Sequence, residues 1–171
     1  VALSASQTGQ VRCDDVKITT DDLLAGPVED VLLKGSGGGA GGLQTSTLAL
    51  GLTRAALRYT AGEAERRPDL QVPVNALREE AERLVVMLLS AAAGEPGSEG
   101  PSTVQALRVR ANSLVLRATQ MSLAAAKGAG YASRHPVGRW CREALFFLVW
   151  SCPQPVVEEN LRELAGLADA V

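Results

Sequence analysis

Apolar residues recur at helical spacing through most of the chain after residue 44, and this pattern predicts a succession of helices. The first helix is predicted from about Thr45 to Arg66. One face of it carries an apolar stripe, made of Leu48, Leu52, Ala55, Ala56 and Tyr59. A second helix is predicted to start near Pro73, because proline suits the first helical position. Its apolar positions repeat at intervals of four, three and four, in Leu77, Ala81, Leu84 and Leu88.

The third predicted helix has the most regular pattern in the chain. Ser102 or Thr103 can cap its start, and Gly128 is a suitable stop. Between them, apolar residues alternate at threes and fours, in Val104, Leu107, Ala111, Leu114, Ala118, Met121 and Ala125. A heptad seam of this kind is typical of antiparallel bundles. We therefore expect a mainly α fold built on a four-helix up-and-down bundle.

The segment HPVGRWCREALFFLVWSCPQP, residues 135–155, contains the fourth predicted helix, from Pro136 to about Trp150. Residues 144–150 carry no charge, and a helix that is apolar all round is buried on all sides. We interpret this half as the central helix of the bundle, although a subunit interface would use the same residues. Pro153 and Pro155 end it. A fifth, short amphipathic helix, from Val156 to Leu167, follows as an extra C-terminal helix.

The N-terminal region has a strand-like pattern. Small polar residues alternate with apolar ones, at Val1, Leu3, Ala5, Val11 and Cys13, which predicts a hairpin or the last two strands of a sheet. The glycine-dominated stretch GSGGGAGG, residues 35–42, predicts a flexible linker. Its match to GxGxxG is weak, because helices rather than a βαβ unit follow it. We expect three parts: a remnant of a β domain at 1–34, a linker at 35–44 and a helical bundle at 45–171.

Composition narrows the classes of function. Apolar residues make up 46% of the chain, and the net charge of −2 results from 17 basic and 19 acidic residues without a basic stripe, which argues against nucleic-acid binding. The longest apolar run is far shorter than a membrane span. The three scattered cysteines form neither a disulfide framework nor a zinc motif, so we expect no metal site and a reducing, cytoplasmic location. The opening lacks a signal-peptide pattern and an initiator Met, which suggests a processed or excerpted chain.

Taken in order, these segments resemble the C-terminal helical domain of the acyl-CoA dehydrogenase family, preceded by the end of its middle β domain. SQTGQVRCDDVKITTDDLLAG looks like the last middle-domain strands and the following loop. RPDLQVP is similar to the family's Arg-x-x-Phe-Gly-x-Pro pattern, with Arg67 as its arginine. KGAGYASRHPVGRWCREA resembles Gly-Gly-x-Gly-Tyr, Tyr-Pro-Val-x-Arg and Arg-Asp-Ala in succession.

The resemblance implies an FAD protein that assembles as a dimer or tetramer through this bundle, with acyl-CoA as the substrate of the full-length oxidoreductase. In the family, the arginine that Arg67 matches contacts the FAD of a neighbouring subunit, and a guanidinium suits a pyrophosphate. Gly128 and Gly130 would let the backbone approach the cofactor. From the residues alone, Arg67 could equally be a solvated charge at a helix end, and Gly128 a plain helix cap.

The chain departs from the family at the catalytic base. The position of the usual Glu falls near Ser151, and a serine does not accept a proton from a thioester at neutral pH. A second position that some members use is also empty, because no acidic residue occurs between Asp30 and Glu63. Glu143 is a weak candidate for a relocated base, with an ion pair as the alternative. His135, the chain's one histidine, is expected to make a local hydrogen bond at a helix start.

Two main functions therefore remain open, and the heptad seam keeps a stand-alone helical regulator or coiled-coil adaptor as a minor third. In the first, the chain is the C-terminal portion of an acyl-CoA dehydrogenase-like flavoprotein, contributing FAD binding and oligomerisation but not catalytic by itself. In the second, the same scaffold is a non-catalytic helical oligomerisation or binding module. The absence of the family's catalytic Glu favours the non-catalytic module. The presence of Arg67, Gly128 and Gly130 favours cofactor binding.

Overall fold

A computed structural model describes residues 9–29, 31, 42–95 and 101–167, and the chain divides into two units, Val1–Gly39 and Ala40–Val171. In the first unit, the described residues form one short 3-10 helix, η1 (Thr20–Asp22), and no strand. Val11 is 85% exposed and Cys13 is also exposed, so the strand predicted there is not formed. A strand needs a neighbour to pair its backbone N–H and C=O groups. Val1, Leu3, Ala5 and most of the predicted linker lie outside the described residues.

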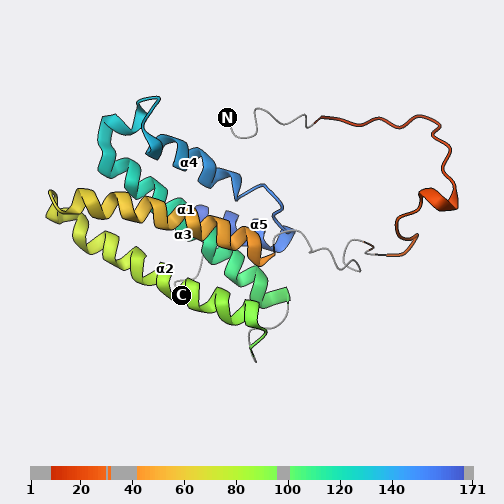
Figure 1. Ribbon diagram of the computed structural model, residues 1–171, viewed down its shortest axis with the longest axis horizontal. Helices are drawn as coiled ribbons and strands as arrows, with labels where there is room; N and C mark the ends of the chain where they lie inside the picture. Colours follow the sequence, from red (N-terminus) through yellow and green to blue (C-terminus); the bar gives the residue numbers. More distant parts are fainter. Residues whose placement is uncertain (1–8, 30, 32–41, 96–100, 168–171) are drawn as a thin grey trace. The chain divides into compact units, whose positions relative to one another are not determined.

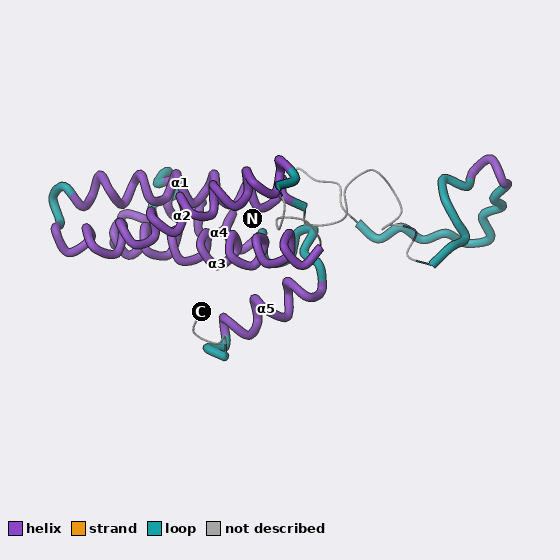
Figure 2. The backbone as a smooth tube through the Cα atoms, turned by 90° about the horizontal axis from the view of Figure 1, so that it is seen from below, coloured by secondary structure: helices purple, strands orange, loops and turns teal. Residues whose placement is uncertain are grey.

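The second unit is helical (Figures 1 and 2). Its elements are α1 (Leu43–Ala64), η3 (Pro68–Leu70), α2 (Gln71–Ala93), α3 (Pro101–Ala126), η4 (Lys127–Tyr131), α4 (Pro136–Phe146) and α5 (Gln154–Leu164). α1, α2, α3 and α4 lie side by side, and α5 packs on α3. Within the described residues, none of the helices combines the length and the apolar character that crossing a membrane requires.

The buried face of α1 overlaps only partly with its predicted apolar stripe. Ala56 is fully buried, Leu52, Ala55 and Tyr59 are half-buried, and Leu48 is exposed. The centre of the buried face is occupied by small residues that include Ser46, Thr53 and Thr60, which are fully buried. Thr53 Oγ1 donates to the carbonyl oxygen of Ala49 at 2.9 Å, so its hydroxyl is satisfied within the helix. The small side chains on this face let α1 pack closely against α3.

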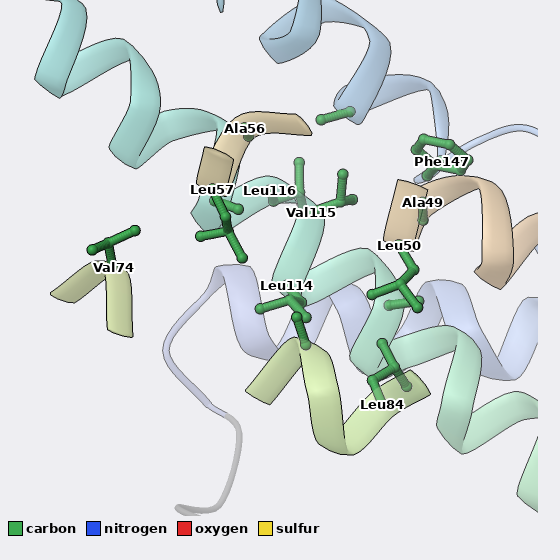
Figure 3. Close-up of a cluster of buried hydrophobic side chains, with 14 of the residues drawn as sticks. Ala49, Leu50, Ala56, Leu57, Val74, Leu84, Leu114, Val115, Leu116 and Phe147 are labelled. Carbon is green, nitrogen blue, oxygen red and sulfur yellow. The ribbon is translucent and has the colours of Figure 1, made fainter. Parts of the chain in front are cut away.

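α3 is the central helix, and the predicted heptad seam on it is confirmed. Leu107, Ala111, Leu114, Ala118 and Ala125 are buried, and Val104 and Met121 are half-buried. Other faces of α3 are buried as well, because it packs against α1, α2, α4 and α5 (Figure 3). The helix begins at Pro101, so the predicted caps Ser102 and Thr103 lie in its first turn, and it ends at Ala126.

α2 joins this core through one face. Val74, Ala81, Leu84 and Leu88 are buried, and Leu77 is half-buried, which agrees with the predicted repeat. The helix ends at Gly94, whose φ of 67° is left-handed, a conformation that glycine adopts at little cost.

The apolar segment 144–150 is not the central helix, which corrects the prediction. α4 ends at Phe146, and the following residues form turns. Ala144 and Phe147 are buried in the core, but Val149 is 74% exposed and Trp150 is 43% exposed. Helix α4 therefore buries one face against α3. Pro153 and Pro155 belong to the start of α5 rather than to the end of α4.

Candidate functional site

Arg67 lies just after α1 and connects it to the end of α3. Its Nη1 donates to the carbonyl oxygen of Ala125 at 3.0 Å, and its Nη2 pairs with Asp69 Oδ2 at 3.0 Å. The carbonyl groups at the end of a helix carry partial negative charge, which favours a guanidinium there. The side chain is 29% exposed, so part of it still faces solvent.

The turn that follows α3 contains Gly128 and Gly130, and the two glycines have different surroundings. α3 ends at Ala126, two residues before the predicted stop at Gly128, and it is Lys127 that takes the left-handed conformation, with φ of 53°. A side chain at Gly128 would meet nothing within 4 Å. Gly130 is buried, and a Cβ there would lie 2.6 Å from Leu123 Cδ1. Its missing side chain is thus explained by packing within the chain.

The start of α4 packs directly on this turn. A Cβ on Gly138 would lie 2.5 Å from the carbonyl oxygen of Gly130, so the two backbones touch where both residues lack side chains. Arg142 Nη1 donates to the carbonyl oxygen of Gly138 at 3.0 Å. The segment that resembles the family thus folds back on itself, and Gly130 and Gly138 position the turn next to Ala125 and Arg67.

Tyr59, His135 and Trp140 form an aromatic cluster between α1 and α4. The Tyr59 ring meets His135 edge-on at 5.5 Å between centroids and Trp140 at 6.2 Å. His135 Nδ1 accepts a hydrogen bond from the Val137 N–H at 3.4 Å and so caps α4, which confirms the predicted local hydrogen bond. Its Nε2 lies 3.5 Å from Tyr59 Oη. Burial, with a smaller contribution from the charge of Glu63, raises the pKa of Tyr59 above its ordinary value.

Glu143, the weak catalytic candidate, and Ser151, at the family's base position, lie elsewhere on the chain. Glu143 Oε1 pairs with Arg139 Nε at 3.2 Å, one turn earlier on α4, and both side chains are largely exposed. Ser151 is half-buried in the connection from α4 to α5 and has a φ of 48°. Glu143 thus makes the ion pair that the sequence left as its alternative role, with Arg139 as the partner.

Sequence reasoning missed a buried polar cluster at the far end of α4. Arg108 on α3 is fully buried, and its Nη2 donates to the carbonyl oxygens of Phe147 at 3.0 Å and Trp150 at 3.2 Å. Asn112 Nδ2 donates to the same Phe147 oxygen at 3.2 Å. Within the described part of the chain, Nε and Nη1 of Arg108 have no hydrogen-bond partner. Burial lowers the pKa of Arg108 and raises that of Cys152.

The described residues contain no group of three or more His, Cys, Asp or Glu side chains placed to hold a metal ion. The chain matches no protein-family model, no curated protein and no solved structure. The site therefore has to be interpreted from its own geometry.

Proposed function

We propose that the chain is the C-terminal portion of an acyl-CoA dehydrogenase-like flavoprotein, in which α1 to α4 act as the family's four-helix up-and-down bundle. One observation carries the proposal. Arg67 and the Lys127–Tyr131 turn are about sixty residues apart in sequence, yet the hydrogen bond from Arg67 to Ala125 holds them at one end of the bundle. These are the segments in which the sequence resembles the family's cofactor-binding residues.

The residues at this end fit a phosphate-bearing cofactor. The described hydrogen bonds of Arg67 use Nη1 and Nη2, which leaves Nε and the second hydrogen of each Nη for an anion. Gly128 is exposed with open space at its α-carbon, so a ligand can approach the backbone there. Gly130 is buried and would position the turn. FAD, when bound, would supply the redox chemistry, and this chain would bind and orient its phosphates.

The same chain is proposed not to catalyse dehydrogenation by itself. At the position of the family's catalytic Glu there is Ser151, whose hydroxyl is too weak a base for the α-proton of an acyl-CoA at neutral pH. The Glu143 carboxylate is paired with Arg139, one turn earlier on α4, and its side chain is 43% exposed, so it is engaged in a partly solvated ion pair. Acyl-CoA would then be a substrate of a longer protein only.

The alternative function is a non-catalytic helical module that joins copies of the chain, and exposed apolar residues on α5 favour it. Leu161 and Leu164 are each 60% exposed. Both functions imply a dimer or tetramer. We also place the protein in the cytoplasm, where the free thiols of Cys13, Cys141 and Cys152 would stay reduced.

Quenching of FAD fluorescence on titration with the 171-residue chain separates the two functions. We expect saturable quenching that Arg67→Ala weakens at least about tenfold, since a charged hydrogen bond to phosphate is worth about 1.5–3 kcal/mol. Arg66→Ala is the matched control, because Arg66 is exposed and its guanidinium pairs only with Glu63 among the described residues. Sedimentation velocity run in parallel reports the oligomer. An oligomer with no quenching would leave the non-catalytic module as the function.

A further inference from the structure

A hollow between α1 and α2 is lined by basic side chains over an apolar floor. Its volume is about 450 Å³, and buried Leu57 and Ala81 lie at its base. Arg54 and Arg58 line it from α1, one turn apart, and Arg78 lines it from α2. None of these residues belongs to the Arg67 site described above.

The hollow stays open because Gly51 lies on its α1 side. A Cβ at Gly51 would meet nothing within 4 Å, so nothing in the packing of the two helices requires glycine there. A glycine inside a helix lowers helix stability relative to alanine. Gly51 therefore brings no side chain into the hollow, and this lowers the helix stability of α1.

The charges in the hollow do not balance. Three arginines face one acid, Glu82, which leaves a formal charge of +2. Glu82 Oε1 is 3.6 Å from Arg54 Nη2, a distance at the edge of an ion pair. Neither Arg58 nor Arg78 makes an ion pair within the described ranges. Two guanidinium groups without acidic partners beside an apolar floor are suited to an anion that also has an apolar part.

We propose that this hollow binds a phosphate monoester that carries an apolar group. A monoester has a charge close to −2 at neutral pH, which matches the surplus charge of the lining. Its three terminal oxygens accept the paired N–H groups of arginine with good geometry. The apolar group would lie against the aliphatic parts of the arginine side chains, above the buried Leu57 and Ala81. A neighbouring hollow of about 480 Å³ continues along α2 and is lined by Arg78, Glu79, Glu82, Arg83 and Val86.

Calorimetric titration of the full chain with phenyl phosphate tests the proposal, with phenol as the uncharged probe. We expect saturable binding of phenyl phosphate only, weakened several-fold when salt is raised from about 0.05 M to about 0.5 M. The double variant Arg58→Gln/Arg78→Gln should weaken it at least about tenfold. Arg162→Gln, an exposed arginine on α5, should leave it within about twofold. Binding that is absent, or equal in the two variants, would overturn the proposal.

Two further arms complete the test. Gly51→Leu keeps every charge and places a side chain over the floor, so it should also abolish binding; unchanged affinity in this variant would contradict the assigned hollow. Cosedimentation with vesicles that contain phosphatidic acid distinguishes the source of the monoester. Vesicle binding that depends on Arg58 and Arg78 would assign the phosphate to a lipid headgroup, and binding of phenyl phosphate alone would assign it to a soluble ester.

Discussion

Arg108 Nη2 lies 3.0 Å from the carbonyl oxygen of Phe147, so a fully buried charge on α3 holds the residue that immediately follows α4. The guanidinium also lies over the Phe147 ring, 5.8 Å from its centroid. No carboxylate pairs with Arg108 in the described ion pairs. Its charge is therefore desolvated without full compensation, which is why burial lowers its pKa.

Replacing Arg108 by methionine should leave the free energy of unfolding unchanged or raise it by up to about 2 kcal/mol. Removing a desolvated charge and filling its volume is often neutral or stabilising. The Phe147 oxygen would keep the hydrogen bond from Asn112. Urea unfolding followed by circular dichroism measures the change.

Arg108→Ala is the informative comparison, because truncation leaves a cavity. It should lower the free energy of unfolding by about 2–4 kcal/mol. Arg110→Met, at an exposed position on the same helix, should stay within about 0.5 kcal/mol of the native chain. If Arg108→Met were as damaging as Arg108→Ala, the two hydrogen bonds would outweigh the desolvation of the charge.

Alkaline pH should destabilise the fold through two thiols. Burial raises the pKa of Cys141 and of Cys152 above the ordinary value of 9.0. The folded chain then keeps these protons at a pH where the unfolded chain loses them. The resulting stability is complete below about pH 9 and is lost as pH rises through the raised values. Urea unfolding with reductant, at several values between about pH 8 and about pH 10.5, measures the decline.

The double variant Cys141→Ala/Cys152→Ala should flatten this decline by up to about 1.4 kcal/mol per pH unit for each thiol. The loss of packing in the variant shifts stability equally at every pH, so the slope isolates the titration. Cys13→Ala is the control, because Cys13 is exposed. An unchanged slope in the double variant would mean that other groups, such as Tyr59, carry the alkaline transition.

Gly138→Ala should lower the free energy of unfolding by about 1–3 kcal/mol, because a close-packed backbone cannot easily move away from an added methyl group. The new Cβ would lie 2.5 Å from the carbonyl oxygen of Gly130. Gly130→Ala should cost less, since the atom it meets at 2.6 Å is the end of the Leu123 side chain. Thermal and urea unfolding both measure these changes.

Gly62→Ala in α1 is the matched control for the glycine variants. Its added Cβ meets nothing within 4 Å, so the gain in helix propensity should raise stability by about 0.5–1 kcal/mol. Equal effects at Gly62 and Gly138 would rule out close backbone packing between the 127–131 turn and α4.

How far the sequence predicts this fold depends on the residue types in each helix. On α3 the buried positions are mostly Leu and Ala, so periodicity alone finds them. On α1 the buried face includes Thr53 and Thr60, which a hydrophobicity pattern does not count. Among the described residues, Ser46 Oγ on this face has no hydrogen-bond partner. The Thr60 hydroxyl is satisfied, because Thr60 Oγ1 donates to the Ala56 carbonyl at 3.1 Å and lies 2.9 Å from Ser122 Oγ. Such pairing depends on helix docking and is invisible in one sequence.

The residues of the candidate sites also differ in whether a sequence pattern could reveal them. Arg67 was found because it belongs to a segment that resembles a known family. Arg108 gave no signal, because arginine is rarely buried and its acceptors are backbone carbonyls about forty residues away. The apolar run 144–150 gave the opposite error, because it predicted burial where the structure has exposed residues. It suggested burial on every side, yet Val149 and Trp150 lie in turns beyond the end of α4.

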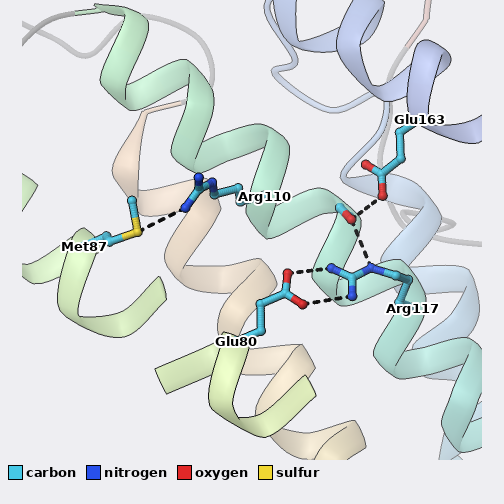
Figure 4. Close-up of polar contacts among 6 residues, drawn as sticks. Glu80, Met87, Arg110, Arg117 and Glu163 are labelled. Atoms are coloured by element: carbon cyan, nitrogen blue, oxygen red, sulfur yellow. Dashed lines mark hydrogen bonds and ion pairs between the residues drawn. The ribbon is translucent and has the colours of Figure 1, made fainter. Parts of the chain in front are cut away.

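The last prediction concerns a polar network that links α2, α3 and α5 (Figure 4). Arg117 on α3 donates to both carboxylate oxygens of Glu80 on α2, at 2.9 and 2.6 Å. Its Nε donates to Ser113 Oγ at 3.1 Å, and Ser113 donates to Glu163 on α5. Both members of the ion pair are partly exposed, so Glu80→Gln should lower the free energy of unfolding by only about 0.5–1 kcal/mol.

Salt separates the ionic part of this network from its packing. In about 1 M NaCl the cost of Glu80→Gln should fall by at least half, because exposed charges are screened over about 3 Å. Arg117→Lys should cost about as much as Glu80→Gln, since lysine cannot form the paired hydrogen bonds of a guanidinium. Glu82→Gln is the control, because its contact with Arg54 is longer and more exposed and should contribute little. If Glu80→Gln and Glu82→Gln lowered the free energy of unfolding in urea equally, the bidentate geometry of the Arg117–Glu80 pair would add nothing to the stability of the bundle.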